Sequence, residues 1–136
     1  MSKTTVCILD DEVIVGDRLQ PELEDEGYEV ETFTDSSKAL ERVYEKCFDV
    51  VITDLKMEGL DGMAFLEKVK EHCPQSEVIV ITGYATMEVF RESFVKGAYE
   101  FIAKPFRLSE IRDAVKKAKK KVKRTNLIGS LKGRTK

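Results

Sequence analysis

The chain has 136 residues, 42% hydrophobic and 35% charged, a length that fits one domain with a single core. No apolar run approaches membrane-spanning length, and residues 1–5 leave no room for a signal peptide before the first apolar run. We therefore expect a soluble, cytoplasmic protein that does not bind membranes.

The three cysteines, Cys7, Cys47 and Cys73, match no metal-ligand spacing, and a core of this size needs no disulfides. Cys7 lies in an apolar run and is expected to be a small core residue. We therefore predict reduced thiols, as is usual for a cytosolic protein.

Apolar runs typical of strands alternate with helical patterns five times along the chain. The strands are expected at residues 6–9, 28–33, 50–53, 78–81 and 100–103. The helices are expected at residues 12–25, from 35 or 36 to near 47, at 62–72, from a cap at Thr86 to 95, and from about 109 into the C-terminal segment. The run at 50–53 has no polar alternation and predicts a strand buried on both faces, whereas 28–33 alternates and predicts an edge strand.

This alternation predicts a single doubly wound α/β domain over residues 4–122, with a five-stranded parallel sheet in the order 2-1-3-4-5 and helices on both faces. Residues 123–136 are expected to be a flexible basic tail or linker. From Asp113 to Lys136 there are ten Lys or Arg residues and one Asp. Because no aromatic residues are interleaved with them, we expect a solvated segment rather than direct nucleic-acid binding.

Each helix has a face that should turn inward. We assign Val13, Leu19 and Leu23 to the first helix and Ala39, Leu40, Val43 and Tyr44 to the second. In the last helix Leu108, Ile111 and Val115 are expected in the core, which leaves Ala118 and Val122 open to either a coiled-coil partner or a linker role. His72, the only histidine, is expected to be solvated at a helix end.

Polar residues follow the buried strands where each strand ends. In the predicted order the first and third strands are neighbours, so Asp10, Asp11 and Asp54 should meet at one edge, with Thr82 and Lys104 ending the next two strands. Two carboxylates about 4 Å apart repel by about 4 kcal/mol at an effective dielectric constant of about 20. A cation should therefore join them, and carboxylate oxygens suit Mg²⁺.

We interpret Asp11 and Asp54 as direct Mg²⁺ ligands and Asp10 as a ligand nearby or through water. Lys104 and Thr82 would complete a receptacle for a phosphoryl group, with Asp54 as the nucleophile that forms an acyl phosphate. Each residue also has a purely structural reading: an aspartate often caps a loop, a threonine ends a strand, and a lysine lies on the surface. The five together favour the functional reading.

Five separated segments carry a family resemblance: residues 8–12, 54–57, 61–63, 81–83 and 97–106. With Asp10-Asp11, Asp54, Thr82 and Lys104-Pro105 in order, the chain resembles a response-regulator receiver domain of two-component signalling over residues 4–122.

The resemblance implies that a sensor histidine kinase or phosphotransfer protein phosphorylates Asp54. It implies Mg²⁺ held by Asp10, Asp11, Asp54 and the backbone carbonyl of Lys56. It also implies a switch through Thr82 and Phe101, and a phosphate-contacting Lys104 before a cis Pro105.

One residue departs from the family pattern, and a second is unusually bulky for its position. Glu58 takes the place where the family usually has proline. Tyr84, which follows Gly83, is bulky, and we predict that it hinders attacking water and lengthens the phosphorylated lifetime.

The leading function is therefore a phosphorylation-controlled signalling module rather than an enzyme. It would act on a downstream output domain or protein, or form a homodimer, through one face. That face is made by the helix expected from Thr86 to 95, the strand at 100–103 and the helix from about 109. One alternative is a pseudo-receiver that binds partners without phosphorylation. An aspartyl phosphohydrolase and a flavin carrier are less consistent, since the chain lacks the Asp-x-Asp motif of the first, and Asp11-Glu12 would repel the phosphate of the second.

Overall fold

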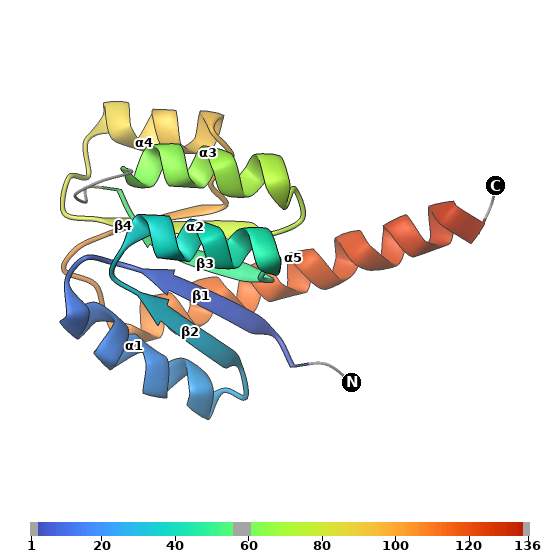
Figure 1. Ribbon diagram of the computed structural model, residues 1–136, viewed down its shortest axis with the longest axis horizontal. Helices are drawn as coiled ribbons and strands as arrows, with labels where there is room; N and C mark the ends of the chain where they lie inside the picture. Colours follow the sequence, from blue (N-terminus) through green and yellow to red (C-terminus); the bar gives the residue numbers. More distant parts are fainter. Residues whose placement is uncertain (1–2, 56–60, 135–136) are drawn as a thin grey trace.

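Strands and helices alternate along the whole described chain, which comprises residues 3–55 and 61–134 of a computed structural model, with side chains described as far as Val122 (Figure 1). The strands are β1 (Thr5–Leu9), β2 (Glu29–Phe33), β3 (Val50–Asp54), β4 (Glu77–Thr82) and β5 (Glu100–Ala103). The helices are α1 (Val13–Asp25), α2 (Ser36–Glu45), α3 (Gly62–His72), α4 (Met87–Val95) and α5 (Leu108–Arg134). These bounds confirm the predicted alternation.

The strands form one parallel sheet in the order β2-β1-β3-β4-β5, as predicted. β2 lies at an edge, which explains its alternating apolar and acidic side chains. The central strand β3 is buried at all five positions, as its uninterrupted apolar run predicted.

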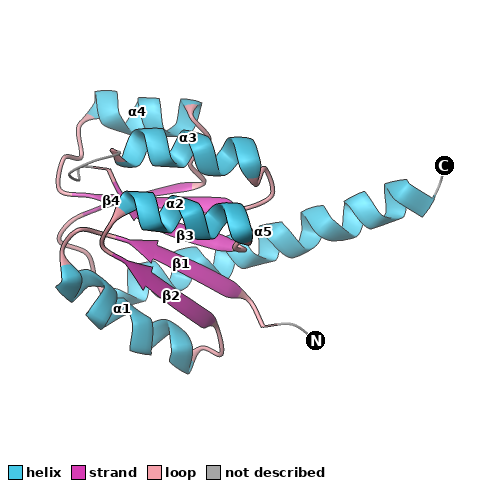
Figure 2. Cartoon of the chain, viewed as in Figure 1, coloured by secondary structure: helices cyan, strands magenta, loops and turns pink. Residues whose placement is uncertain are grey.

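The helices cover both faces of the sheet, with α1 and α5 on one side and α2, α3 and α4 on the other (Figures 1 and 2). Successive side chains of a strand point to opposite faces, so β1 contributes to two cores. Val6 and Ile8 pack with Leu19 of α1, whereas Leu9 packs with Phe65 of α3. Because apolar side chains point to both faces of the sheet, a hydrophobic core lies on each side of it.

Short-range capping fixes where several helices begin and end. The side chain of Asp35 accepts hydrogen bonds from the backbone of α2, that of Asp61 accepts one from Ala64 N, and that of Thr86 accepts one from Val89 N. At the end of α4, Gly97 adopts a φ of 110°, a conformation that favours glycine. The predicted stop of this helix is therefore confirmed.

Some predicted inward faces are shifted. Val13 and Tyr44 are 59% and 49% exposed. In α1 it is Val15, rather than Val13, that shares a buried helical face with Leu19, and in α2 the buried residues are Ser36, Ala39 and Val43. In α5, Ala118 and Val122 are buried in the monomer, and Ala118 belongs to the core under α1. Packing within one chain therefore accounts for both residues, because α5 continues across the sheet further than the pattern indicated.

The prediction of reduced thiols is also corrected, since Cys47 and Cys73 form a disulfide with an S–S distance of 2.10 Å. Cys47 follows α2 and Cys73 follows α3, and the ends of these two helices lie together at one edge of the sheet. This proximity arises from the crossover topology, which the sequence spacing does not show. Cys7 is buried as predicted, and burial raises the pKa of its thiol.

α5 runs to Arg134, and its C-terminal part projects beyond the sheet (Figure 1). The assignment of 123–136 as a separate tail or linker stays a prediction. In the described part of the chain, no helix is long and apolar enough to cross a membrane.

Candidate functional site

The candidate site lies at the edge of the sheet where the parallel strands end. Leu9 at the end of β1 pairs with Thr53 of β3, so the next residues, Asp10 and Asp54, are neighbours across the two strands. On the other side Thr82 pairs with Ala103, so Lys104 leaves the sheet directly after β5. Strand register thus brings the predicted acids and the predicted lysine to one edge.

Lys104 joins the two buried acids. Its Nζ donates hydrogen bonds of 2.8 Å to Asp10 Oδ2 and of 2.8 Å to Asp54 Oδ2. Both carboxylates are nearly buried, Asp10 at 2% and Asp54 at 5% exposure. The other oxygen of Asp10, Oδ1, accepts the backbone N–H of Glu12 at 2.9 Å. Two hydrogen bonds therefore fix the Asp10 carboxylate, and the ammonium of Lys104 orients Asp54.

Burial and hydrogen bonding act in opposite directions on the pKa values of Asp10 and Lys104. Burial raises the pKa of Asp10, and the hydrogen bonds from Lys104 and the Glu12 backbone offset this only in part. For Lys104, burial disfavours the charged form, but the hydrogen bonds to Asp10 and Asp54 outweigh it and raise the pKa. The amine therefore stays protonated at neutral pH and acts as a fixed positive charge.

A cavity of about 290 Å³ opens above these side chains, lined by Asp11, Glu12, Asp54, Gly83, Tyr84 and Lys104. Asp11 is exposed on its wall, whereas oxygens of Asp10, Glu12 and Asp54 all lie within 4.8 Å of one another. Sequence reasoning therefore missed Glu12 as a candidate ligand. The signal was present, because Asp10 and Glu12 are two residues apart and flank the turn that Asp10 Oδ1 closes.

Thr82 is fully buried at the end of β4. Its hydroxyl Oγ1 accepts the backbone N–H of Tyr84 at 3.0 Å, and the residue lines a neighbouring cavity that also includes Met63 and Val89. The hydroxyl is therefore engaged by its own loop, and Thr82 is not among the residues that line the cavity above Asp54.

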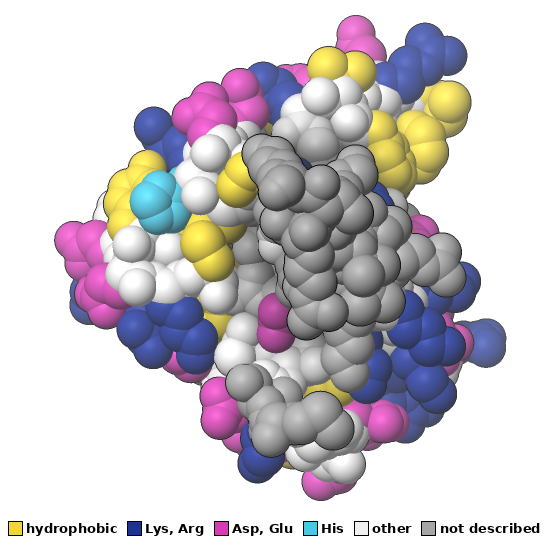
Figure 3. All heavy atoms as spheres, turned by 90° about the vertical axis from the view of Figure 1, so that its right-hand side faces the viewer, with side chains coloured by type: hydrophobic (Ala, Val, Ile, Leu, Met, Phe, Trp, Pro, Cys, Tyr) yellow, Lys and Arg dark blue, Asp and Glu magenta, His cyan; other side chains and the backbone are white. Residues whose placement is uncertain are grey.

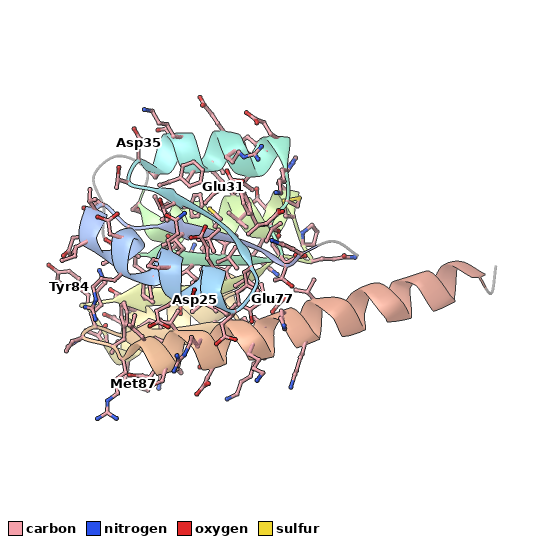
Figure 4. All side chains as sticks on the ribbon, turned by 90° about the horizontal axis from the view of Figure 1, so that it is seen from below. Asp25, Glu31, Asp35, Glu77, Tyr84 and Met87 are labelled. Atoms are coloured by element: carbon pink, nitrogen blue, oxygen red, sulfur yellow. A yellow bond between two sulfur atoms is a disulfide. The ribbon has the colours of Figure 1, made fainter. Side chains whose placement is uncertain are left out.

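Tyr84 extends from that same loop and is 56% exposed at the end of the molecule opposite Glu77, which begins β4 (Figure 4). It borders both cavities. Its predicted effect on attacking water stays a prediction, and its position beside the cavity above Asp54 allows that prediction to be tested.

Phe101, the predicted switch residue, is half-buried on β5 and packs against the core beneath α3 and α4. Its ring lies 5.4 Å from that of Phe90 in an edge-to-face arrangement, and Phe90 lies 4.8 Å from Phe94. An aromatic row thus connects the sheet to the exposed side of α4.

Gly62 is a further residue that the site requires. A Cβ atom at this position would lie 1.9 Å from the backbone oxygen of Asp54 and 2.5 Å from Leu55 Cα. The close approach is held by the hydrogen bond of 2.9 Å from Gly62 N to Leu55 O. Glycine here lets α3 pack against the backbone that carries Asp54.

Two predictions fall on residues 56–60, outside the described part of the chain: the metal-binding backbone carbonyl of Lys56 and the departure at Glu58. The Lys104–Pro105 peptide bond is described, and it is cis.

The described donors fit a hard divalent cation. Three carboxylates and the single ammonium of Lys104 leave an excess of two negative charges when all are ionised. Oxygens that ligate Mg²⁺ at about 2.1 Å in an octahedron lie about 3 to 4 Å apart, which agrees with a cluster whose oxygens lie within 4.8 Å. The residues that could hold Mg²⁺ are therefore Asp10, Glu12 and Asp54, with Asp11 on the cavity wall.

Comparison with known proteins gives consistent results. A family model described as the response regulator receiver domain matches residues 6–116. The chain is 35% identical over 131 residues to a putative NtrX-like response regulator of Rickettsia typhi, covering 93% of this chain but only 28% of that protein. It is 34% identical over 117 residues to sporulation initiation phosphotransferase F of Bacillus subtilis, covering 86% of this chain and 94% of that protein.

Solved structures show the same similarity. A CheY-like response regulator receiver domain protein from Methanospirillum hungatei superposes with a TM-score of 0.88 at 28% identity, over 91% of this chain and 99% of that one. NtrX from Brucella abortus superposes with a TM-score of 0.88 at 30% identity, over 96% of this chain and 30% of that one. By its sequence, its CheY-like fold and the matched family model, the chain belongs to the response regulator receiver domain family.

Proposed function

We propose that this receiver domain accepts a phosphoryl group on Asp54 from a sensor histidine kinase or phosphotransfer protein. The observation that carries the proposal is the Lys104 ammonium, which holds a nearly buried Asp54 carboxylate at the base of a solvent-reached cavity. Few structural roles require a carboxylate at a strand end to face such a cavity with a half-buried ammonium as its partner.

The step is a transfer between two nucleophiles. A carboxylate oxygen of Asp54 attacks the phosphorus of a phosphohistidine, the P–N bond breaks, and an acyl phosphate forms while the imidazole leaves with the electron pair. Lys104, which donates a hydrogen bond to Asp54, would transfer that bond from the carboxylate to a phosphoryl oxygen. Mg²⁺ bound at Asp10, Glu12, Asp11 and Asp54 would neutralise charge on the transferring group.

The proposed consequence is a change in the face formed by α4, β5 and α5. On release from the Tyr84 N–H, the Thr82 hydroxyl would turn toward the phosphoryl group, and Phe101 would follow into the space beside it. α4 is suited to report this, since Ser93 is its only buried residue and four apolar side chains are exposed: Met87, Phe90, Phe94 and Val95. Such a face fits a downstream partner or a second copy of the chain.

Treatment of the chain with acetyl phosphate and Mg²⁺ tests the proposal. We expect a mass gain of one phosphoryl group that hydroxylamine removes, and its loss in Asp54→Asn. Asp35→Asn is a matched control, because Asp35 caps α2 away from the site and asparagine caps equally well. An unmodified parent chain would instead support the pseudo-receiver, which binds partners without phosphorylation.

A further inference from the structure

A second cluster of reactive side chains lies at the opposite end of the strands from Asp54, where β3 and β4 begin. Cys47 precedes β3, and Cys73 follows His72 at the end of α3. The two Sγ atoms and a ring nitrogen of His72 all lie within 4.8 Å of one another. None of these residues takes part in the proposed phosphoryl transfer.

The cluster is open to solvent. Cys47 and His72 are exposed and Cys73 is 3% exposed. A cavity of about 330 Å³ adjoins all three residues and extends to Asp49 and to Val122 of α5. Figure 3 looks toward the end of the molecule from which α5 projects and shows the histidine colour at the surface beside apolar side chains. The cluster therefore has both access and space for a further ligand.

The backbone around the cysteines is held independently of the disulfide. The Ser76 hydroxyl donates a hydrogen bond to the backbone oxygen of Phe48, and Glu77 N donates one of 3.0 Å to Asp49 O. These contacts tie the residues after Cys47 to the residues after Cys73. The His72 ring packs edge-to-face on Tyr44 with 4.9 Å between centroids. Opening of the S–S bond would therefore leave the two thiols and the imidazole close together.

Two thiolates and one imidazole are a ligand set that Zn²⁺ prefers. With Zn–S bonds of about 2.3 Å in a tetrahedron, the sulfurs would lie about 3.8 Å apart. Cys47 is exposed and lies in the loop before β3, so its side chain has room to move once the S–S bond is open. The Cα atoms of the two cysteines lie 5.7 Å apart. Water or an exogenous group would take the fourth position from the adjoining cavity.

We propose that the reduced thiols of Cys47 and Cys73, together with His72, form a binding site for Zn²⁺ or a similar thiophilic cation, which the disulfide abolishes. A dithiol or phosphine reductant supplies the two electrons that break the S–S bond and is itself oxidised. The two thiols then lose one proton each as the metal–sulfur bonds form. Oxidation by a disulfide oxidant reverses this and releases the cation.

The test uses the full chain, reduced with a phosphine and desalted without oxygen, and titrated with Zn²⁺ or Co²⁺ in excess Mg²⁺. We expect one ion bound per chain, thiolate charge-transfer absorption with Co²⁺, and a shift of the imidazole NMR signals, which are unambiguous because the chain has one histidine. The oxidised chain should bind none. A reduced chain that binds no ion, or whose imidazole signals do not move, would overturn the proposal.

Variants separate the two sites. Cys47→Ser and His72→Gln should each weaken Zn²⁺ binding by at least about tenfold, with unchanged melting curves for the reduced proteins because both side chains are exposed. Asp54→Asn is the matched control and should leave Zn²⁺ binding unchanged. Binding that persists in Cys47→Ser but is lost in Asp54→Asn would place the ion at the carboxylates and refute the thiolate site, whatever the outcome of phosphorylation.

Discussion

Lys104 Nζ and Asp54 Oδ2 are joined by a hydrogen bond of 2.8 Å although 50 positions separate the residues in sequence. The same ammonium bonds Asp10 at 2.8 Å and lies 3.6 Å from Glu12 Oε1. The ammonium of Lys104 therefore serves as a counter-ion for the carboxylates of Asp10, Asp54 and Glu12. A phosphoryl group on Asp54 would take over this bond.

Removal of that counter-ion should destabilise the protein. In Lys104→Met, Asp10 and Asp54 stay nearly buried without the ammonium, and loss of one member of a buried ion pair costs about 3 kcal/mol. We expect a lower melting temperature in chelator and a larger gain on addition of Mg²⁺ than in the parent. Thermal unfolding with and without Mg²⁺ measures both, and an unchanged melting temperature would contradict the counter-ion role.

The pH dependence of stability should reveal the cost of ionising Asp10. Because its pKa is raised above 3.8 in the folded state, its contribution to stability is present below that value and is lost as the pH rises through the folded pKa. Asp10→Asn should therefore be more stable than the parent at pH 7 in chelator, and this advantage should shrink on acidification. Urea unfolding across the acid range measures the difference in unfolding free energy between Asp10→Asn and the parent. A difference that grows toward low pH would contradict the prediction.

Mg²⁺ should stabilise the parent through the carboxylate cluster. Asp54→Asn removes one ligand and the repulsion between Asp54 and Asp10, so we expect a higher melting temperature in chelator and a smaller shift with Mg²⁺. The Asp35→Asn control should retain the parent shift. Equal Mg²⁺ shifts in the parent and in Asp54→Asn would argue against a metal site at this edge.

Gly62→Ala should be strongly destabilising, by about 3 kcal/mol, because the added Cβ would meet the Asp54 carbonyl at 1.9 Å and backbone cannot easily yield. Gly83→Ala is the matched control in the same region, since nothing lies within 4 Å of its Cβ position. Urea unfolding of the two variants should separate them clearly. Similar values for both would mean that α3 is free to move away from Asp54.

Tyr84→Ala should shorten the lifetime of the phosphorylated chain. The ring borders the cavity above Asp54, and its removal widens the path for water to the acyl phosphate. The rate of phosphate release after removal of the donor measures the effect, for which we expect an increase of several-fold. Tyr44→Ala, which changes an exposed tyrosine on α2, should leave that rate unchanged.

Local sequence patterns were sufficient to predict the fold. Local patterns located β5 and α3 at their observed bounds, and the acid at the end of a buried run identified Asp54. Errors arose where a residue's environment depends on distant elements. Ala118 was left open to a coiled-coil partner or a linker role because the sequence does not show how far α5 overlies the sheet. Val13 was assigned to the core, whereas its side chain is exposed.

The sequence by itself determined the order of strands and helices and which polar residues stand at the strand ends, because these depend on local periodicity and on general rules of parallel topology. Only the tertiary structure decided which atoms meet. Lys104 contacts both acids, Glu12 rather than Asp11 joins their cluster, Gly62 packs on the Asp54 backbone, and Cys47 reaches Cys73. Such contacts depend on strand register and helix packing to within an ångström, which no local pattern encodes.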